Sequence, residues 1–272
     1  MMTGNETDRP TADRERELAG ALAALRARID AAAAAAGRDP AEIQLLPVTK
    51  FFPATDVLIL YRLGCRAFGE SREQEASRKI AEVHNSVDSA QIRWHMVGRI
   101  QRNKARAITR WAYAAHSVDN MRLVTALDRA ATEALADGTR AEPLRVFIQV
   151  SLDGDENRGG ADIARPELID ELCRAADAAE GLEFVGLMAV PPLGADPDAA
   201  FARLAAEQTR VQQLVGRPLQ LSAGMSGDLE AAVRHGSTCV RVGTALLGQR
   251  PLPSPEVVTP VTSSSQTTEP QS

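Results

Sequence analysis

Short apolar runs of strand length alternate along this chain with longer stretches that repeat apolar residues at helical spacing. The alternation constrains the fold strongly, because neighbouring parallel strands need crossover connections and helices usually provide them. The runs expected to be strands are Ile43–Lys50, Arg66–Glu70, Arg93–Gly98, Ala112–Val118, Leu144–Leu152, Leu182–Val190, Leu219–Gly224 and Cys239–Gly248. The stretches expected to be helices are Arg14–Ala36, one beginning at Pro53, Arg72–Val83 with Ser71 as its cap, Gln101–Thr109, Asp119–Ala136, Ala164–Ala179, Pro197–Val215 and Gly227–His235.

Eight strands, each but the last followed by a helix, predict an α/β fold with a parallel sheet. In a chain of this length they fit a single-domain (β/α)8 TIM barrel, with Arg14–Ala36 as an additional leading helix. A doubly wound open sheet is the alternative. Pro47 is an irregularity in the first strand, because proline has no N–H to donate to a neighbouring strand.

Composition and charge narrow the class of protein. Of 272 residues, 44% are apolar and 25% are charged, which is enough to bury a large core. Residues 1–13 and 251–272 lack apolar periodicity, so we expect two disordered tails around one domain of residues 14–250. Lys and Arg number 31 against 36 Asp and Glu, and the resulting net charge of −5 disfavours a nucleic-acid partner.

The cysteines and the N-terminus indicate the compartment. Cys65, Cys173 and Cys239 are far apart and lack C-x-x-C spacing, which predicts neither disulfides nor a zinc site and fits a reducing environment. No apolar run is long enough to span a bilayer, and the polar, acidic N-terminus is unlike a secretory signal. We therefore expect a cytoplasmic protein without membrane contact.

Lys50 ends the first expected strand. By period-2 alternation it shares a face with Leu46 and Val48, so it points into the barrel mouth, where ligands bind in this fold. Apolar surroundings disfavour the ammonium form, and a free amine condenses with an aldehyde to give a Schiff base. The alternative is a lysine that extends to solvent at the end of a strand.

Two turns rich in small residues follow the seventh and eighth strands. They are SAGMSGD (Ser222–Asp228) and RVGT (Arg241–Thr244). Unpaired amides at a helix start attract anions, and the loops after these two strands form the recurrent phosphate site of barrels. The pair therefore predicts a phosphate site; the alternative is that the glycines only make tight turns.

Arg241 lies two residues before Gly243, so both point to the same face of the last strand, into the barrel. A guanidinium only donates hydrogen bonds and stays protonated. Such an arginine would hold a pyridine ring nitrogen as an unprotonated acceptor and weaken the ring as an electron sink. The alternative is an arginine paired with a core carboxylate.

Other motifs do not indicate function. The segment Asp153–Ala164 begins like a calcium loop, but Arg158 and Ala164 replace the required glycine and glutamate, so we expect it to line the barrel mouth instead. The basic run Arg99–Arg110 is expected to be a solvated helix face. The serines lack a G-x-S-x-G elbow, which argues against a serine hydrolase. No metal site is predicted, because none of the histidines are four residues apart; they are His84, His95, His116 and His235.

Six segments in order carry a family resemblance. They are PVTKFFPATDV (Pro47–Val57), FGESREQEA (Phe68–Ala76), WHMVGRIQRNK (Trp94–Lys104), HSVDN (His116–Asn120), GLMAV (Gly186–Val190) and LSAGMSGDLEAAVRHGSTCVRVGTALLG (Leu221–Gly248). Together they resemble the pyridoxal-phosphate homeostasis proteins, small cytosolic barrels related to the N-terminal domain of alanine racemase. The resemblance covers about Arg14 to Pro251.

The resemblance implies a cofactor site. It implies that Lys50 holds pyridoxal 5′-phosphate as a Schiff base and that Arg241 contacts the ring nitrogen. The phosphate contacts that it implies are Ser222, Met225, Ser226, Gly243 and Thr244. At two positions the chain departs from the family, because Ser71 replaces an asparagine and Ala223 replaces a methionine.

The resemblance also implies a function. We expect a monomer that binds, buffers and delivers pyridoxal phosphate, with apo forms of enzymes that use this cofactor as candidate recipients. The short polar sequence after Gly248 leaves no second domain to place an acid–base residue over the cofactor, so we expect little or no turnover and no catalytic residue. One alternative is a single-domain amino-acid racemase that uses Lys50 with His95 or Ser71 as second base. Another is a Schiff-base aldolase without a cofactor.

Overall fold

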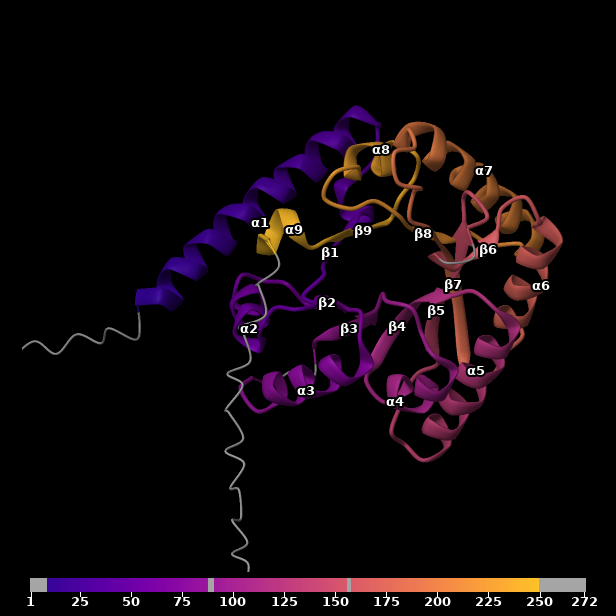
Figure 1. The fold of residues 1–272 in the computed structure, drawn as a ribbon, viewed down its shortest axis with the longest axis horizontal. Coiled ribbons are helices and arrows are strands. Elements are labelled where there is room, and N and C mark those ends of the chain that lie inside the picture. The colour runs from indigo at the N-terminus through magenta and orange to yellow at the C-terminus, as the bar shows by residue number, and fades with distance from the viewer. Residues whose placement is uncertain (1–8, 88–90, 156–157, 250–272) are drawn as a thin grey trace, which may run out of the picture.

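The computed structural model describes residues 9–87, 91–155 and 158–249 (Figure 1). Its strands are β1 (Gln44–Pro47), β2 (Ala67–Glu70), β3 (Arg93–Met96), β4 (Ala112–Val118), β5 (Leu144–Ser151), β6 (Ala161–Asp162), β7 (Leu182–Met188), β8 (Gln220–Ser222) and β9 (Cys239–Val242). Its α-helices are α1 (Arg9–Ala35), α2 (Ala54–Arg62), α3 (Glu73–His84), α4 (Ala105–Thr109), α5 (Met121–Ala136), α6 (Pro166–Asp177), α7 (Pro197–Val215), α8 (Leu229–Arg234) and α9 (Thr244–Leu247).

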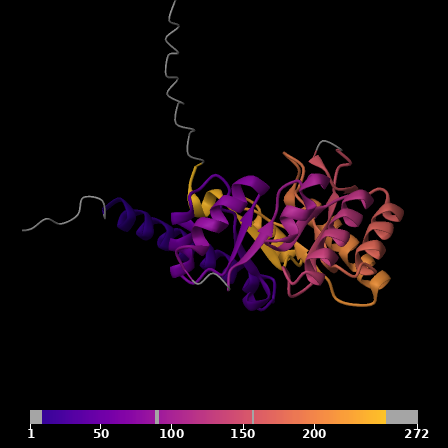
Figure 2. The same cartoon turned by 90° about the horizontal axis from the view of Figure 1, so that it is seen from below.

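The predicted tails lie almost wholly outside the described residues. The predicted tail over residues 251–272 falls entirely outside them, and that over residues 1–13 falls outside them except for residues 9–13. Those five residues are helical, because α1 begins at Arg9 and not at Arg14. In Figures 1 and 2, α1 extends beyond the barrel at its N-terminal end.

The strands form a nearly closed parallel barrel. Their order around it is β1-β9-β8-β7-β5-β4-β3-β2, and the short β6 pairs only with β5. Val48, just after β1, bridges Gly69 on β2, and the Thr49 amide donates to the Gly69 carbonyl at 2.9 Å. The ends of the sheet therefore meet, which confirms the (β/α)8 barrel and excludes the open doubly wound sheet.

Pro47 fits into β1 because of the direction in which its missing N–H would point. The amides of Gln44 and Val48 donate toward β9, whereas the amide of Thr49 donates toward β2. Alternation places the Pro47 nitrogen on the β2 side, where pairing begins only at Val48. The proline therefore removes no hydrogen bond from the β1–β9 ladder.

Apolar side chains pack in two places. Two large clusters lie between the strands and the surrounding helices, and α1 contributes Leu18, Leu22 and Leu25 to one of them. Smaller clusters fill the inside of the barrel, one around Leu46 and one around Phe147. The interior also holds buried polar side chains, which build the candidate site described below.

Several local predictions differ from the structure. The N-cap of α3 is Arg72, whose backbone is extended and whose side chain makes no capping bond, so the prediction of Ser71 as cap is wrong. The last strand is followed by the short α9, and the two-residue β6 was not predicted. The predicted helix over residues 101–109 is a 3-10 turn (Arg102–Lys104) followed by α4. None of the helices in the described part of the chain is long and apolar enough to cross a bilayer.

Candidate functional site

A chain of buried hydrogen bonds crosses the inside of the barrel from β9 to β3. Arg241 donates through Nη1 to the Ser222 hydroxyl at 2.6 Å and through Nη2 to the Ala189 carbonyl at 2.9 Å. The same hydroxyl lies 2.8 Å from His116 Nδ1, and His116 Nε2 lies 2.9 Å from His95 Nδ1. The chain thus links four strands and connects an arginine to two histidines.

The arginine fixes the direction of the first bond only. A guanidinium only donates, so Ser222 Oγ accepts from Arg241. The direction of the other two bonds depends on the tautomers of His116 and His95, and the chain ends at His95 Nε2, a buried atom without a hydrogen-bond partner among the described residues. Burial lowers the pKa of His95 to about 3 and that of His116 well below its usual value. Both histidines are therefore neutral at pH 7.

Arg241 carries a buried charge without an ionic partner. It is 6% exposed, and within the described ranges no carboxylate lies at ion-pair distance from it. The alternative of an arginine paired with a core carboxylate is therefore excluded within the described residues, and burial lowers the pKa of the Arg241 guanidinium. Its two observed acceptors are a serine hydroxyl and a peptide carbonyl, so it can still serve a neutral acceptor on a ligand.

The two predicted phosphate loops lie side by side. The Ala245 amide in α9 donates to Ser226 Oγ at 3.1 Å, which joins the loop after β9 to the loop after β8. Met225 is 37% exposed, and its amide donates to Asp228 Oδ1 at 2.5 Å. In the described part of the chain, four further amides have no partner in the protein, and they belong to Ser226, Gly227, Gly243 and Thr244. Together they offer N–H donors to an anion.

Gly224 makes the first of these loops possible. Its φ is +91°, a left-handed conformation that favours glycine, and an added Cβ would lie 2.6 Å from the Ala232 Cβ in α8. The neighbouring Ala223 is fully buried in the cluster between strands and helices, facing away from Arg241. The departure at Ala223 therefore changes core packing and leaves the polar interior unaltered.

Lys50 lies just beyond β1, at the same end of the barrel as these loops. Its side chain is exposed, with Nζ 5.8 Å from the centre of the Phe51 ring. The expectation of apolar surroundings for Lys50 is therefore wrong, because β1 ends at Pro47 and the lysine sits in the following turn. This turn lies close to the second phosphate loop. A Cβ added to Gly243 would be 3.5 Å from the carbonyl oxygen of Val48, which is two residues before Lys50.

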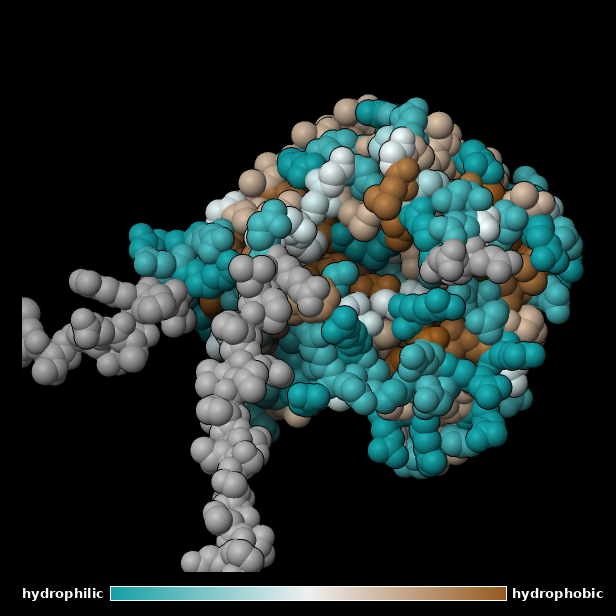
Figure 3. Space-filling model, viewed as in Figure 1, coloured by the Kyte–Doolittle hydropathy of each residue, from teal (hydrophilic) through white to brown (hydrophobic). Residues whose placement is uncertain are grey.

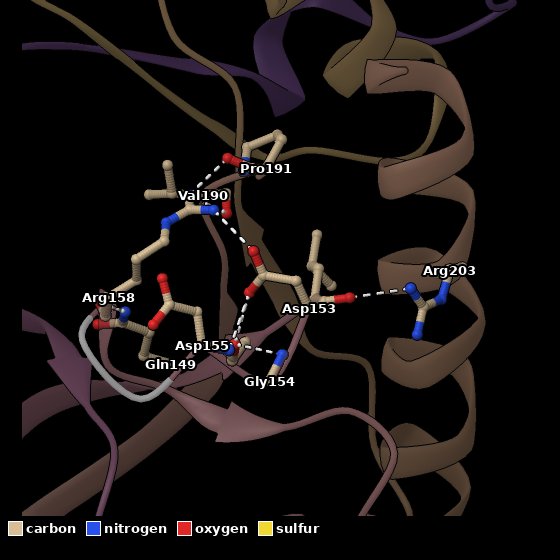
Figure 4. Close-up of polar contacts among 10 residues, drawn as sticks. Gln149, Asp153, Gly154, Asp155, Arg158, Val190, Pro191 and Arg203 are labelled. Atoms are coloured by element: carbon tan, nitrogen blue, oxygen red, sulfur yellow. Dashed lines mark hydrogen bonds and ion pairs between the residues drawn. The ribbon is translucent and has the colours of Figure 1, made fainter. Parts of the chain in front are cut away.

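The loop after β5 contacts the chain that leaves the neighbouring strand β7 (Figure 4). Arg158 donates to the carbonyls of Val190 and Pro191, at 3.2 and 2.6 Å, and pairs with Asp153 at 3.1 Å. These contacts tie the loop to the chain that leaves β7, so the prediction that it lines the mouth is confirmed. Residues 156 and 157 of this loop lie outside the described part.

A cleft of about 900 Å³ opens beside the Lys50 turn. It runs along α3 toward residues 99–108, and its lining residues include Ser71 and the apolar Phe51, Met96 and Ile100. Figure 3 shows a hollow near the middle of the strand ring, with hydrophobic residues inside a hydrophilic rim. Arg102, Arg106 and Arg110 are exposed, as predicted for a solvated face. The described residues hold no group of His, Cys, Asp and Glu that could bind a metal ion.

The structure unites most residues that the sequence indicated, and it adds others. Arg241, Ser222 and the two loops come together, and Lys50 stands at the neighbouring strand end. The Ser222 hydroxyl already serves Arg241 and His116, so its contact with a phosphate stays a prediction. The role of His116 was missed; a histidine inside the apolar run Ala112–Val118 was the available signal.

Proteins of similar sequence show which family the chain belongs to. The sequence model of the alanine racemase N-terminal domain matches residues 21–251. A pyridoxal phosphate homeostasis protein of Mycobacterium bovis is 61% identical over 249 residues, which cover 89% of this chain and 96% of the relative. The chain belongs to this family. The pyridoxal phosphate homeostasis protein of Escherichia coli K12 is 34% identical over 244 residues.

Solved structures agree on the fold. PipY of Synechococcus elongatus PCC7942, solved with pyridoxal phosphate bound, superposes with a TM-score of 0.71 at 34% identity, over 85% of this chain and all of that one. Alanine racemase of Corynebacterium glutamicum superposes with a TM-score of 0.59 at 18% identity, over 85% of this chain and 62% of that one. The second likeness shows that this homeostasis-family chain shares the racemase barrel.

Proposed function

We propose that this chain binds pyridoxal 5′-phosphate on Lys50 as a Schiff base, buffers it and delivers it, with little or no turnover. Relatives named pyridoxal phosphate homeostasis proteins support this function, and so does PipY, which binds the cofactor in a barrel 34% identical in sequence. The cofactor supplies an aldehyde that condenses with an amine. Condensation with the Lys50 amine forms a C=N bond and releases one water, so it needs no further reactant.

The observation that carries the proposal is the buried guanidinium of Arg241. A buried cation without a carboxylate is costly unless a ligand or a polar group receives its hydrogen bonds. The ring nitrogen of pyridoxal phosphate is such an acceptor. Arg241 would hold this nitrogen unprotonated, and Ser222 and Ala189 keep the guanidinium in place.

The other predicted contacts fit the same ligand. The free amides of Ser226, Gly227, Gly243 and Thr244 are placed to bind its phosphate. Lys50, exposed at the adjacent strand end, is open to an aldehyde arriving from solvent. The residues of this chain therefore fit pyridoxal phosphate at its aldehyde, its ring nitrogen and its phosphate.

The groups around the proposed ring position support low turnover. An arginine partner would keep the ring nitrogen unprotonated, which weakens the ring as an electron sink. His95 is 3% exposed, neutral and bonded to His116, so it is not placed to take a proton from a bound amino acid. Ser71 forms no hydrogen bond that would activate its hydroxyl in the described part of the structure.

The test is a titration of the purified apo protein with pyridoxal phosphate, followed by its absorbance. We expect a saturable yellow species that borohydride bleaches and that passes the cofactor to an added apo enzyme. A colourless protein after titration would contradict the proposal and favour the cofactor-free aldolase. The racemase alternative stays open because the chain shares the barrel of alanine racemase. Optical rotation assays on amino acids test it, and rates well above those of free cofactor would refute low turnover.

The proposal includes the setting of the protein. Cys65, Cys173 and Cys239 are free and buried, in keeping with a reducing cytoplasm. We place the protein there as a monomer whose recipients are apo enzymes rather than nucleic acid or membrane. Light scattering on the holo protein tests the monomer, since a dimer mass would contradict it.

A further inference from the structure

Side chains from α3 hold the backbone on both sides of Lys50. The amide of Phe51, which follows the lysine, donates to Glu75 Oε1 at 2.6 Å. Lys79 Nζ donates to the carbonyl of Thr49, which precedes the lysine, at 2.8 Å. Glu75 and Lys79 are four residues apart, so they lie on one face of α3, and their charged atoms are 3.7 Å apart. The Lys50 turn is thus gripped from a single helix.

Glu70, at the end of β2, completes this contact. Its Oε1 accepts from Lys79 Nζ at 2.7 Å and from the Thr49 hydroxyl at 2.6 Å. Glu70 is fully buried and Lys79 is 5% exposed. Burial raises the pKa of the Glu70 carboxyl, and the Lys79 ammonium opposes that shift. Both ends of the ion pair therefore act on Thr49.

Stability alone does not account for such a pair. Removing two charges from water costs several kcal/mol per ion, and their mutual attraction only roughly offsets this cost. Proteins in which apolar residues replace such a pair are often as stable. What the pair achieves here is geometric. Phe51 has a φ of +70°, a left-handed conformation that costs an aromatic residue on the order of 1–3 kcal/mol and persists only where its surroundings fix it.

We propose that Lys79, Glu70 and Glu75 are positioning residues that fix the Lys50 turn and so set how fast its amine condenses with an aldehyde. Among the described residues, the contacts that these three side chains make with the turn are to Thr49 and Phe51, so they act through the turn and not by contact with the amine. The inference rests on the proposed function of Lys50. It adds to it that the reactivity of the lysine depends on a helix outside the barrel mouth.

Two ligands separate positioning from binding. Pyridoxal 5′-phosphate binds and condenses, whereas pyridoxine 5′-phosphate carries an alcohol in place of the aldehyde and can only bind. We expect the Glu75→Ala variant to form the Schiff base about tenfold more slowly at saturating pyridoxal phosphate, because small misplacements of a reacting group cost that much or more. Its affinity for pyridoxine 5′-phosphate, measured by calorimetry, should stay at the parent value. Glu75→Gln keeps an acceptor oxygen for the Phe51 amide and should restore the rate.

The ion pair is tested by the double variant Glu70→Gln with Lys79→Met, which removes both charges and leaves no lone buried ion. It should show the same split between rate and affinity. The matched control is the double variant Arg145→Met with Glu183→Gln, which removes both charges of an ion pair at the starts of β5 and β7, at the end of the barrel opposite Lys50. Thermal unfolding checks that each variant folds. If the double variant does not fold, Glu75→Ala still tests the proposal, because it keeps the Glu70–Lys79 pair.

The outcomes distinguish the two proposals. Parent-like rates in Glu75→Ala and in the double variant would overturn the positioning role and leave the proposed function intact. Equal losses of rate and of pyridoxine 5′-phosphate affinity would also overturn it, because they would mean that the cofactor site itself is damaged. A parent protein that forms no Schiff base would overturn the proposed function, and the positioning role with it.

Discussion

Acidification should destabilise this protein through the two histidines inside the barrel. Burial lowers the pKa of His95 from 6.5 to about 3, and that of His116 also falls well below 6.5. Below about pH 6.5 the unfolded chain therefore binds protons that the folded chain does not. Stability from this source is complete above pH 6.5 and is lost as the pH falls toward the folded pKa values.

The size of the effect follows from the shift. Each buried histidine that stays neutral makes the free energy of unfolding fall by about 1.4 kcal/mol per pH unit below the unfolded pKa. About two pH units below 6.5, His95 alone has removed about 3 kcal/mol, and His116 adds to the loss in the same direction. That is a large part of the whole stability of many domains, about 5–15 kcal/mol.

The assay is urea unfolding over a pH series for the parent and for His95→Gln. Glutamine does not titrate, and its amide can accept or donate the hydrogen bond with His116 Nε2. Below about pH 6, the plot of unfolding free energy against pH should be shallower for the variant by about 1.4 kcal/mol per unit. The same substitution at the exposed His84 is the matched control. Equal slopes for the parent and His95→Gln would refute the neutral, buried state of His95.

Two further substitutions test the barrel and the site. Gly186→Ala should destabilise the fold by about 3 kcal/mol or more, because the new Cβ would lie 1.9 Å from the Gln220 carbonyl oxygen in the β7–β8 pair. A melting temperature unchanged from the parent's would contradict this packing. Arg241→Met should weaken pyridoxine 5′-phosphate binding about tenfold or more by removing a charged donor, as calorimetry would show; parent affinity in a folded Arg241→Met protein would place the ring nitrogen elsewhere.

The fold was predictable from the sequence because its elements follow their periodicity. The strand Ala112–Val118 and the helix Pro197–Val215 have the predicted bounds in the structure, and the helix is bounded by capping residues, Asp196 at its start and Gly216 at its end. Strand ends were less certain. β1 stops at Pro47, so the rule of alternation that placed Lys50 on the inner face no longer applies at the lysine itself.

The polar contacts of the site were not predictable, because they join residues far apart in the sequence. His116 meets Ser222 across 106 positions, and no local spacing announces that contact. Lys79 lies in a helix with many charged residues, yet it is buried against Glu70. The glycine turns were easier to find, since the left-handed φ of Gly224 restricts the residue type at that position.

The central claim is that Lys50 is the residue that bonds to the cofactor. Its most direct test is mass spectrometry of peptides from the holo protein after borohydride reduction, which makes the bond permanent. The account predicts one modified peptide, containing Lys50, and no adduct in Lys50→Ala. An adduct on Lys79, Lys104 or another side chain, or none at all, would contradict it.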